Sequence, residues 1–285
     1  VAVRAPFMTT AADEDRLNTA IKQAQKCGLK KVGFDAAKEG YASGKLLAKN
    51  GFVECPSLIS VLREVKDAAE IKIIRDACRI AYNAYEYVKP LIKTGMTELD
   101  VAAELEKYMR THGATTTSFY TIVGFGEDCA NPHHVTGSRK LKAEDCILMD
   151  FGCIYNGYCS DITRSWWHGK KEPAEYKKIW QLTDKARKAG IKAVKPGMAT
   201  RDVDTTARNI IKAGGYGPYF THGLGHGMGM ENHETPYNNQ ESDAVLVAGN
   251  IVTVEPGIYL PGKYGVRLED TVAVTETGCK ILTKK

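Results

Sequence analysis

The sequence predicts an α+β protein in which a small α/β unit precedes a larger region of two similar α-α-β halves. Two segments of similar sequence support the two halves, one beginning at Ile92 and the other at Val194. Each segment follows one helical stretch, leads into a second, and is followed by β-rich sequence. The chain has 285 residues, 43% hydrophobic and 26% charged, which is enough to form a sizeable core. The halves are therefore expected to face each other across a cleft, about a pseudo-twofold axis.

The first predicted domain covers residues 1–62 and alternates strands with helices. Apolar spacing predicts strands over residues 1–7 and 31–35 and helices over residues 12–26 and 38–49. Mixed extended structure and turns are expected after the second helix. This order is that of a small β-α-β-α unit.

The second predicted domain covers residues 63–285 and begins with a long amphipathic helix over residues 64–89. The apolar stripe of this helix consists of Ile71, Ile74, Cys78, Ala81, Tyr85 and Val88. A comparable helix over residues 173–192 precedes the second half. The boundary between the domains is placed near Arg63, where this helical pattern replaces the shorter elements.

The next helix of each half has predicted ends. Thr97 and Thr200 are expected N-caps, because a threonine hydroxyl can accept a hydrogen bond from a free backbone N–H of the first turn. Gly113 and Gly214 are expected to end the same two helices.

Composition and charge exclude several classes of function. The formal net charge is +5 and the basic residues are spread along the chain, which argues against nucleic acid as a partner. No apolar stretch reaches the roughly 18 residues of a membrane span. The first residues do not have the pattern of a signal peptide, so a cytoplasmic location is expected.

The eight cysteines lie far apart, and none forms a C-x-x-C pair. This spacing predicts reduced and mostly buried thiols rather than a disulfide framework. A zinc or redox role is the alternative.

Asp150 and Asp161 lie on two strands that are predicted to form a hairpin. Asn156 and Gly157 form a two-residue turn, so Tyr155 faces Tyr158 and Asp150 faces Thr163. In this register the two aspartates project from the same face as diagonal neighbours, roughly 7 Å apart at the backbone. An unpaired carboxylate in an apolar strand must find a cation, a proton or hydrogen bonds. Either aspartate alone could instead accept from nearby backbone groups.

The second half repeats this pattern, since Glu255 and Glu269 each lie in an apolar strand-like run. A proline and several glycines between the two runs leave their register open. Four carboxylates, two from each half, are therefore expected to converge on the cleft.

Three histidines, His222, His226 and His233, lie in one glycine-rich stretch between these pairs of acids. Glycine lets the backbone pass close to a ligand, and neutral imidazole is a common metal ligand. Carboxylates with an imidazole suit two Mn, Co, Fe or Zn ions better than a structural zinc site. The sequence therefore predicts a dinuclear metal centre.

Several motifs occur together in this order along the chain: Met149-Asp-Phe-Gly, Ser160-Asp-Ile-Thr-Arg, His222-Gly-Leu-Gly-His-Gly, His233-Glu-Thr-Pro, Val254-Glu-Pro-Gly-Ile-Tyr and Gly265-Val-Arg-Leu-Glu-Asp. With them the sequence resembles the pita-bread metallopeptidases, which include Xaa-Pro aminopeptidases, prolidases, methionine aminopeptidases and creatinase. The second and the last motif resemble those of the Xaa-Pro branch. The resemblance implies a pita-bread catalytic domain over residues 63–285. It also implies that residues 1–62 are the later part of a creatinase-type N-terminal domain.

The resemblance further implies the metal ligands. They are Asp150, Asp161, His226, Glu255 and Glu269, and Asp161 and Glu269 are expected to bridge both ions. All five ligands are present, which argues against a metal-free creatinase. Manganese or cobalt is the expected metal, with zinc or iron as alternatives.

The residues that contact substrate are implied in the same way. His222 and His233 match histidines that bind substrate and the transition state. His133 matches a histidine that precedes the first aspartate, and the adjacent His134 is the alternative. Arg267 matches an arginine of the Xaa-Pro branch and is expected either to bind a carboxylate or to organise the site.

The expected function is hydrolysis of the bond between an N-terminal residue and proline, of the aminopeptidase P or prolidase type. Glu255 is the expected proton acceptor from the attacking water. A methionine aminopeptidase-like enzyme and an inactive pita-bread protein that binds other proteins are the alternatives. The resemblance also implies a homodimer.

Overall fold

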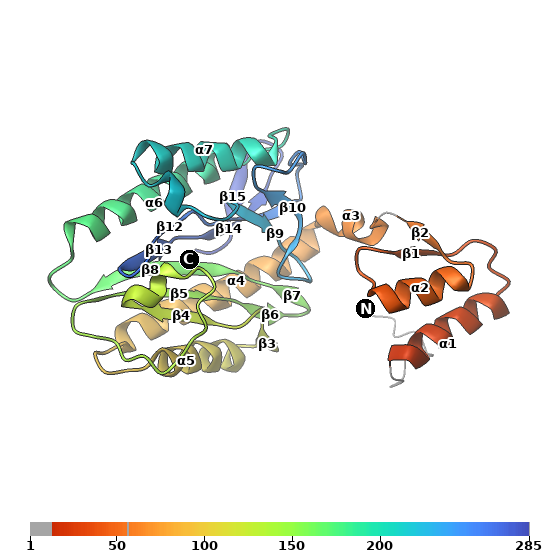
Figure 1. Cartoon of the computed structure of the whole chain (residues 1–285), viewed down its shortest axis with the longest axis horizontal. Helices are drawn as coiled ribbons and strands as arrows, with labels where there is room; N and C mark the ends of the chain where they lie inside the picture. Colours follow the sequence, from red (N-terminus) through yellow and green to blue (C-terminus); the bar gives the residue numbers. More distant parts are fainter. Residues whose placement is uncertain (1–12, 56, 285) are drawn as a thin grey trace. The chain divides into compact units, whose positions relative to one another are not determined.

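The computed structural model describes residues 13–55 and 57–284, and its backbone divides into two compact units after Leu62. The first unit contains four elements labelled in Figure 1, α1 (Asp13–Lys26), β1 (Gly33–Asp35), α2 (Tyr41–Lys49) and β2 (Val53–Cys55), and helix α3 (Leu58–Glu64) runs across its boundary. The two strands pair in parallel, and Ile21, Phe34 and Leu47 form a small core. The strand predicted over residues 1–7 lies outside the described residues. The assignment of this unit to a creatinase-type domain stays a prediction.

Helix α2 begins later than predicted, because the residues after β1 form a turn. The N–H groups of Lys38 and Glu39 donate to the Asp35 carbonyl, and the Ala37 N–H donates to the Asp35 carboxylate. A side chain that accepts from the backbone two residues later is typical of such a turn. The helix therefore starts at Tyr41 rather than at residue 38.

Helix α4 (Ala68–Val88) opens the larger unit, and the prediction of one helix from residue 64 was wrong. Asp67 accepts from the N–H groups of Ala69 and Glu70, and Glu70 accepts from the Asp67 N–H. This reciprocal capping box fixes the start of α4. The preceding N–H, that of Lys66, donates to the Gly249 carbonyl instead of continuing a helix.

The first half of the larger unit comprises α4, α5 and two three-stranded antiparallel sheets. Its remaining elements are α5 (Glu98–Thr111), β3 (Thr116–Thr117), β4 (Ile122–Phe125), β5 (Asp145–Phe151), β6 (Cys153–Tyr155), β7 (Tyr158–Cys159) and β8 (Ile162–His168). The strand orders are β4-β5-β8 and β3-β6-β7. The apolar faces of α4 and α5 pack on β4 and β5 in one core cluster.

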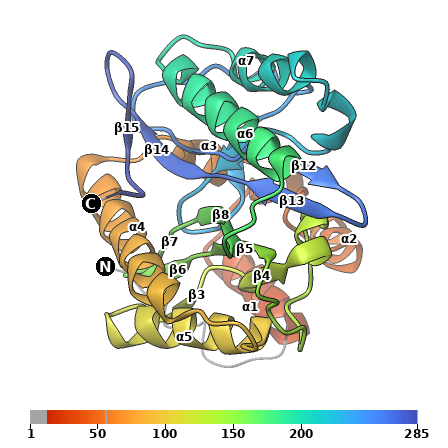
Figure 2. The same cartoon turned by 90° about the vertical axis from the view of Figure 1, so that its left-hand side faces the viewer.

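The second half repeats this order of two helices and then strands. Its elements are α6 (Ala174–Ala193), α7 (Thr200–Ala213), β9 (Gly225–Gly227), β10 (Glu234–Asn238), β11 (Ile251–Val254), β12 (Gly257–Leu260), β13 (Tyr264–Arg267), β14 (Asp270–Val274) and β15 (Cys279–Ile281). Short 3-10 turns occupy Lys89–Leu91, Gly126–Ala130 and Gly217–Tyr219. Five strands form a sheet in the order β10-β9-β11-β14-β15, and β12 pairs with β13. In the larger unit, α6 and α7 lie on one side of the strands and α5 on the other (Figures 1 and 2), so the predicted α-α-β halves are confirmed.

The predicted hairpin has the predicted register. Tyr155 pairs with Tyr158 and Asp150 with Thr163. Asn156 and Gly157 have φ angles of +48° and +83°, the left-handed conformation that this type of turn requires at both positions.

The predicted helix caps were correct in the first half and partly wrong in the second. The Thr97 hydroxyl accepts from the Asp100 N–H as expected. The N-cap of α7 is Ala199 rather than Thr200. Thr200 is fully buried, and its hydroxyl is hydrogen-bonded to the Ser242 hydroxyl and to the Ala244 carbonyl, so tertiary contacts use it. Gly214 is the C-cap of α7, as predicted.

The two halves meet along β8, in what we call the central seam. Hydrogen bonds join every second residue of one half to every second residue of the other, pairing Asp161 with Thr271, Thr163 with Glu269 and Ser165 with Arg267. All six residues are buried, with at most 4% of their surface exposed. The seam therefore fixes where each half places its carboxylates.

All eight cysteines are free thiols, and five of them are buried. Among the described residues, no helix has the length and apolar character needed to cross a membrane.

Candidate metal centre and active site

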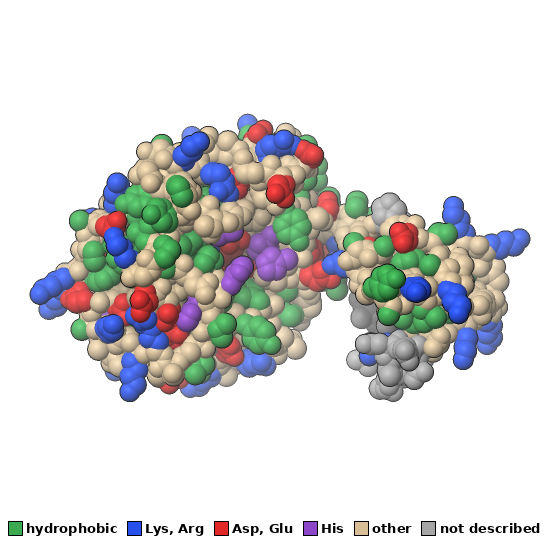
Figure 3. Space-filling model, in the orientation of Figure 1, with side chains coloured by type: hydrophobic (Ala, Val, Ile, Leu, Met, Phe, Trp, Pro, Cys, Tyr) green, Lys and Arg blue, Asp and Glu red, His purple; other side chains and the backbone are tan. Residues whose placement is uncertain are grey.

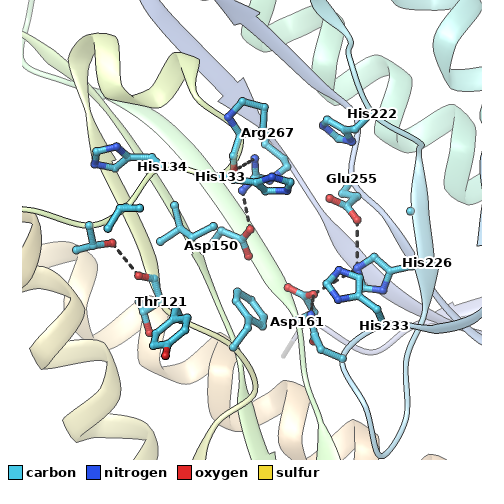
Figure 4. Close-up of a pocket in the computed structure, with 18 of the residues that line it drawn as sticks. Thr121, His133, His134, Asp150, Asp161, His222, His226, His233, Glu255 and Arg267 are labelled. Carbon is cyan, nitrogen blue, oxygen red and sulfur yellow. Dashed lines mark hydrogen bonds and ion pairs between the residues drawn. The ribbon is translucent and has the colours of Figure 1, made fainter. Parts of the chain in front are cut away.

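A cavity of about 850 Å³ lies in the larger unit and is lined by residues of both halves (Figure 4). Histidine side chains gather in a hollow on the face shown in Figure 3. Asp150, Asp161, His226 and Glu255 all line the cavity, and Glu269 is buried close to Asp161 and His226. The structure thus brings together the five residues predicted as metal ligands.

Strand ends position the four carboxylates. Asp150 lies near the end of β5, and Asp161 directly precedes β8. Glu255 directly follows β11, and Glu269 directly precedes β14. These pairs of strands are neighbours in their sheets, so each half delivers two acids to one place.

His226 lies in β9 close to three of the carboxylates. Its Nε2 is 3.3 Å from Glu255 Oε1 and 3.6 Å from Asp161 Oδ2. One potential ligand atom each of Asp161, His226 and Glu269 lies within 4.8 Å of the others. A Cβ on Gly225 would collide with the Thr253 carbonyl, so this glycine lets β9 lie against β11 and brings His226 to the acids.

Burial makes charge on these acids costly. The pKa of Asp161 is raised well above its ordinary value by burial and then by the charges of Glu269 and Asp150. The pKa of Glu269 is raised for the same reasons, with Glu255 as the first neighbouring charge. Burial raises the pKa of Glu255 to about 8, although Arg267 opposes the shift. Such a cluster of like charges needs either protons or cations.

Several carboxylate oxygens lack hydrogen-bond partners within the described protein. Asp150 Oδ1, Asp161 Oδ1 and Glu269 Oε1 are buried without one. Buried polar atoms are normally satisfied, and an unsatisfied carboxylate oxygen beside a histidine is a donor for a metal ion. The donor set therefore fits divalent metal ions.

The opposite oxygens of the same carboxylates are held in place. The Thr163 hydroxyl donates to Glu269 Oε2 at 2.7 Å, and Asn232 Nδ2 donates to Asp161 Oδ2 at 3.2 Å. Arg267 donates to Asp150 Oδ2 at 2.6 Å. In each of these three acids, a hydrogen bond to one oxygen orients the carboxylate, and the second oxygen has no partner.

Arg267 is buried, with 3% of its surface exposed, and all of its nitrogens are engaged. Besides Asp150, its guanidinium donates to the Pro132 carbonyl, the Tyr259 hydroxyl and the Thr163 hydroxyl. Of the two predicted roles for Arg267, these contacts favour organising the site over binding a substrate carboxylate.

Both ring nitrogens of His222 make hydrogen bonds within the protein. Its Nδ1 lies 2.7 Å from the Gly223 carbonyl and its Nε2 lies 2.8 Å from the Tyr259 hydroxyl. Because Tyr259 already accepts from Arg267, its own proton is directed to His222 Nε2, and the histidine carries its proton on Nδ1. Burial lowers the pKa of His222 to about 4, so the ring is neutral.

The other histidines line the same cavity. The His233 ring lies 4.2 Å from the His226 ring, and burial, followed by the charge of His226, lowers the pKa of His233 to about 4. His133 and His134 both line the cavity, and His134 Nε2 contacts Glu98 at 2.7 Å. Of this adjacent pair, His134 is the one held by a buried acid.

Glu98, Asp128 and His134 form a second group with metal-ligand geometry. The Glu98 oxygens already accept from the N–H groups of Phe125 and Gly137, both at 2.9 Å. These hydrogen bonds satisfy Glu98 without a metal ion, so the group fits a structural role.

Sequence reasoning did not identify Tyr259, Arg63 or Lys66. Lys66 Nζ donates to Glu234 Oε2 at 3.0 Å, and Arg63 pairs with the other oxygen of Glu234. Glu234 directly follows His233, so this network holds the histidine's chain segment. The motif His233-Glu-Thr-Pro contained the acid, but its cations are distant in sequence and carry no local signal.

Comparisons with known proteins give a family match and several similar proteins. Residues 72–276 match the family described as Metallopeptidase family M24. An "Uncharacterized peptidase YqhT" from Bacillus subtilis is 38% identical, over 94% of this chain and 76% of that protein. An "Xaa-Pro dipeptidase" from Pyrococcus furiosus is 42% identical, over 82% of this chain and 67% of that protein.

Solved structures are also similar. An Xaa-Pro dipeptidase from Bacillus anthracis matches with a TM-score of 0.90 and 39% identity, covering 94% of this chain and 76% of that one. An X-Pro aminopeptidase from Thermotoga maritima MSB8 matches with a TM-score of 0.86 and 34% identity, covering 97% and 79%.

Proposed function

The chain belongs to metallopeptidase family M24, and on this basis we propose that it hydrolyses the bond between an N-terminal residue and proline. Its larger unit has the pita-bread fold of that family. The observation that carries the proposal is the set of four carboxylates near His226, two from each half, three of which keep a buried oxygen without a hydrogen-bond partner.

Two divalent ions are the proposed cofactors, held by the five residues named above: Asp150, Asp161, His226, Glu255 and Glu269. When bound, such ions lower the pKa of water and polarise a carbonyl. The family membership supports a metal cofactor. Manganese or cobalt as its identity stays a prediction.

Glu255 is the proposed acceptor of the proton from the attacking water, because it lines the cavity beside His226. His233 is the proposed donor to the scissile carbonyl oxygen, since it is neutral and faces the cavity. His222 is already bound to Gly223 and Tyr259, so we assign it a place in the cavity wall. His133 is proposed to position the peptide.

The proposed substrates are peptides with proline as the second residue. The homodimer and the cytoplasmic location stay predictions.

The test is hydrolysis by metal-stripped protein that is resupplied with Mn, Co or Zn. The substrates are Ala-Pro, Ala-Pro-Leu and Met-Ala-Ser. The proposal expects metal-dependent release of alanine from a proline peptide without cleavage of Met-Ala-Ser. Cleavage of Met-Ala-Ser alone would indicate a methionine aminopeptidase.

Two further outcomes separate the remaining alternatives. Lack of hydrolysis with two metal ions bound would refute the substrate class. Lack of hydrolysis with no metal bound would favour a protein that binds other proteins without catalysis.

A further inference from the structure

The cavity extends from the carboxylates to a largely hydrophobic surface, which we call the apolar wall. The wall consists of Leu99, Ala102, Phe119, Tyr120, Ile122 and Val135. Tyr120 is 96% exposed and Val135 is 85% exposed, so the described residues leave this side open. Hydrophobic side chains are visible beside the histidines in Figure 3. The volume of about 850 Å³ lies in the upper part of the range for small-ligand pockets, about 300–1,000 Å³.

The cavity offers no free positive charge on its described lining. Arg267 is the single lysine or arginine among those lining residues, and Asp150, Pro132, Tyr259 and Thr163 take its donors.

The apolar wall is accompanied by a negative charge. Glu106 lines the same cavity and accepts from the Thr121 hydroxyl at 2.9 Å. An anion placed against this wall would find no unpaired lysine or arginine on the described lining, and it would be repelled by Glu106.

A substrate's length decides where its terminal carboxylate lies. In an Xaa-Pro dipeptide the carboxylate belongs to the proline itself, about 3.8 Å by Cα spacing from the first residue, so it must stay inside the cavity. In a longer peptide that position is a neutral amide, and the next side chain can contact the apolar wall.

We infer that this cavity selects peptides that continue beyond proline with an apolar residue, and that it disfavours Xaa-Pro dipeptides. The inference rests on the proposed function and adds to it the class of substrate. It distinguishes this chain from relatives whose printed names are dipeptidases.

The experiment compares Ala-Pro, Ala-Pro-amide and Ala-Pro-Leu with the metal-loaded full chain. The inference expects kcat/KM for the amide to exceed that for the dipeptide by about tenfold or more. The leucine peptide is expected to be better still, mainly through a lower KM. A dipeptide cleaved as well as the amide would overturn the inference and leave the proposed function standing. No cleavage of any of the three would overturn both.

A charge variant gives an independent readout. Val135→Lys introduces a cation at the apolar wall and is expected to raise kcat/KM for Ala-Pro several-fold relative to Ala-Pro-amide. Val247→Lys is the matched control, because Val247 is 45% exposed and does not line the cavity. Circular dichroism checks that both variants are folded. An unchanged substrate ratio in Val135→Lys, the same as in Val247→Lys, would contradict the inference.

Discussion

Replacing Lys66 with methionine should destabilise the larger unit and misplace the segment of His233. The Lys66 side chain is 2% exposed and the Glu234 side chain 7% exposed, so the pair is buried. Methionine retains most of the length of the lysine side chain but removes its charge. The carboxylate of Glu234 then keeps Arg63 and the Glu231 N–H as its partners.

Removing one partner of a buried ion pair lowers the free energy of unfolding by about 3–5 kcal/mol. Because Glu234 keeps two other partners, Lys66→Met is expected at the lower end of this range. A loss of about 3 kcal/mol corresponds to a fall in Tm of about 6–12 °C for a unit of this size. Because Glu234 is adjacent to His233, kcat/KM should fall by about 10- to 100-fold.

The same pair makes stability depend on pH. Burial alone would raise the pKa of Glu234, but the hydrogen bond from the Glu231 N–H and the charge of Lys66 outweigh it, so the pKa is lowered. A carboxyl with a lowered pKa contributes its full stability above the unfolded value of about 4.3. That contribution is lost as the pH falls through the lower folded pKa. Lys66→Met should move this loss to higher pH.

Urea unfolding monitored by circular dichroism measures the stability, and Ala-Pro-Leu hydrolysis measures the activity. Lys72→Met is the matched control, because the Lys72 side chain is 67% exposed and pairs with Asp76 on one helix. Lys72→Met should lower the free energy of unfolding by no more than about 0.5 kcal/mol. Equal stability losses in the two variants would refute the assignment of a buried network.

Three other perturbations test the centre and its surroundings. Asp161→Asn should abolish metal-dependent turnover while the protein remains folded, and calorimetry should show weaker metal binding; unchanged turnover would disprove the assigned site. Glu98→Gln should lower the free energy of unfolding by about 2 kcal/mol in urea, because its hydrogen bonds to two N–H groups and His134 involve a buried acid. Metal-free protein should lose thermal stability as the pH rises from about 6.5 to about 8, because burial raises the pKa of Glu255 to about 8 and the folded state holds a proton that the unfolded chain has released. Glu255→Gln should reduce this loss, and a Tm that rises over this interval would contradict the assigned direction.

The first half of the candidate site could be predicted from sequence because its turn fixes its register. Asn156 and Gly157 allow one compact hairpin, and the positions of Asp150 and Asp161 then follow from strand alternation. The second half has no such constraint. Pro256 follows Glu255 and a separate hairpin intervenes before Glu269, so only the folded chain shows how these acids meet.

Other features depend on contacts between distant residues. The break between α3 and α4 did have a local signal, since Asp67 and Glu70 have capping-box spacing. The N-cap at Thr200 could not be excluded from sequence, because Ser242 and Ala244, which its hydroxyl contacts, are distant along the chain. Tyr259 was missed for the same reason, since its partners come from two other segments.

The central seam sets the distance between the carboxylates of the two halves. Its hydrogen bonds pair Thr163 with Glu269 and Ser165 with Arg267, so the two halves can match only at intervals of two residues. A slip of one residue would shift one half by about 3.3 Å along the strand, nearly the spacing of about 3.5–4 Å between two metal ions that share ligands. Such a slip would also turn the hydroxyls of Thr163 and Ser165 away from their partners. The alternation of side chains along the strands therefore fixes the distance between the paired acids.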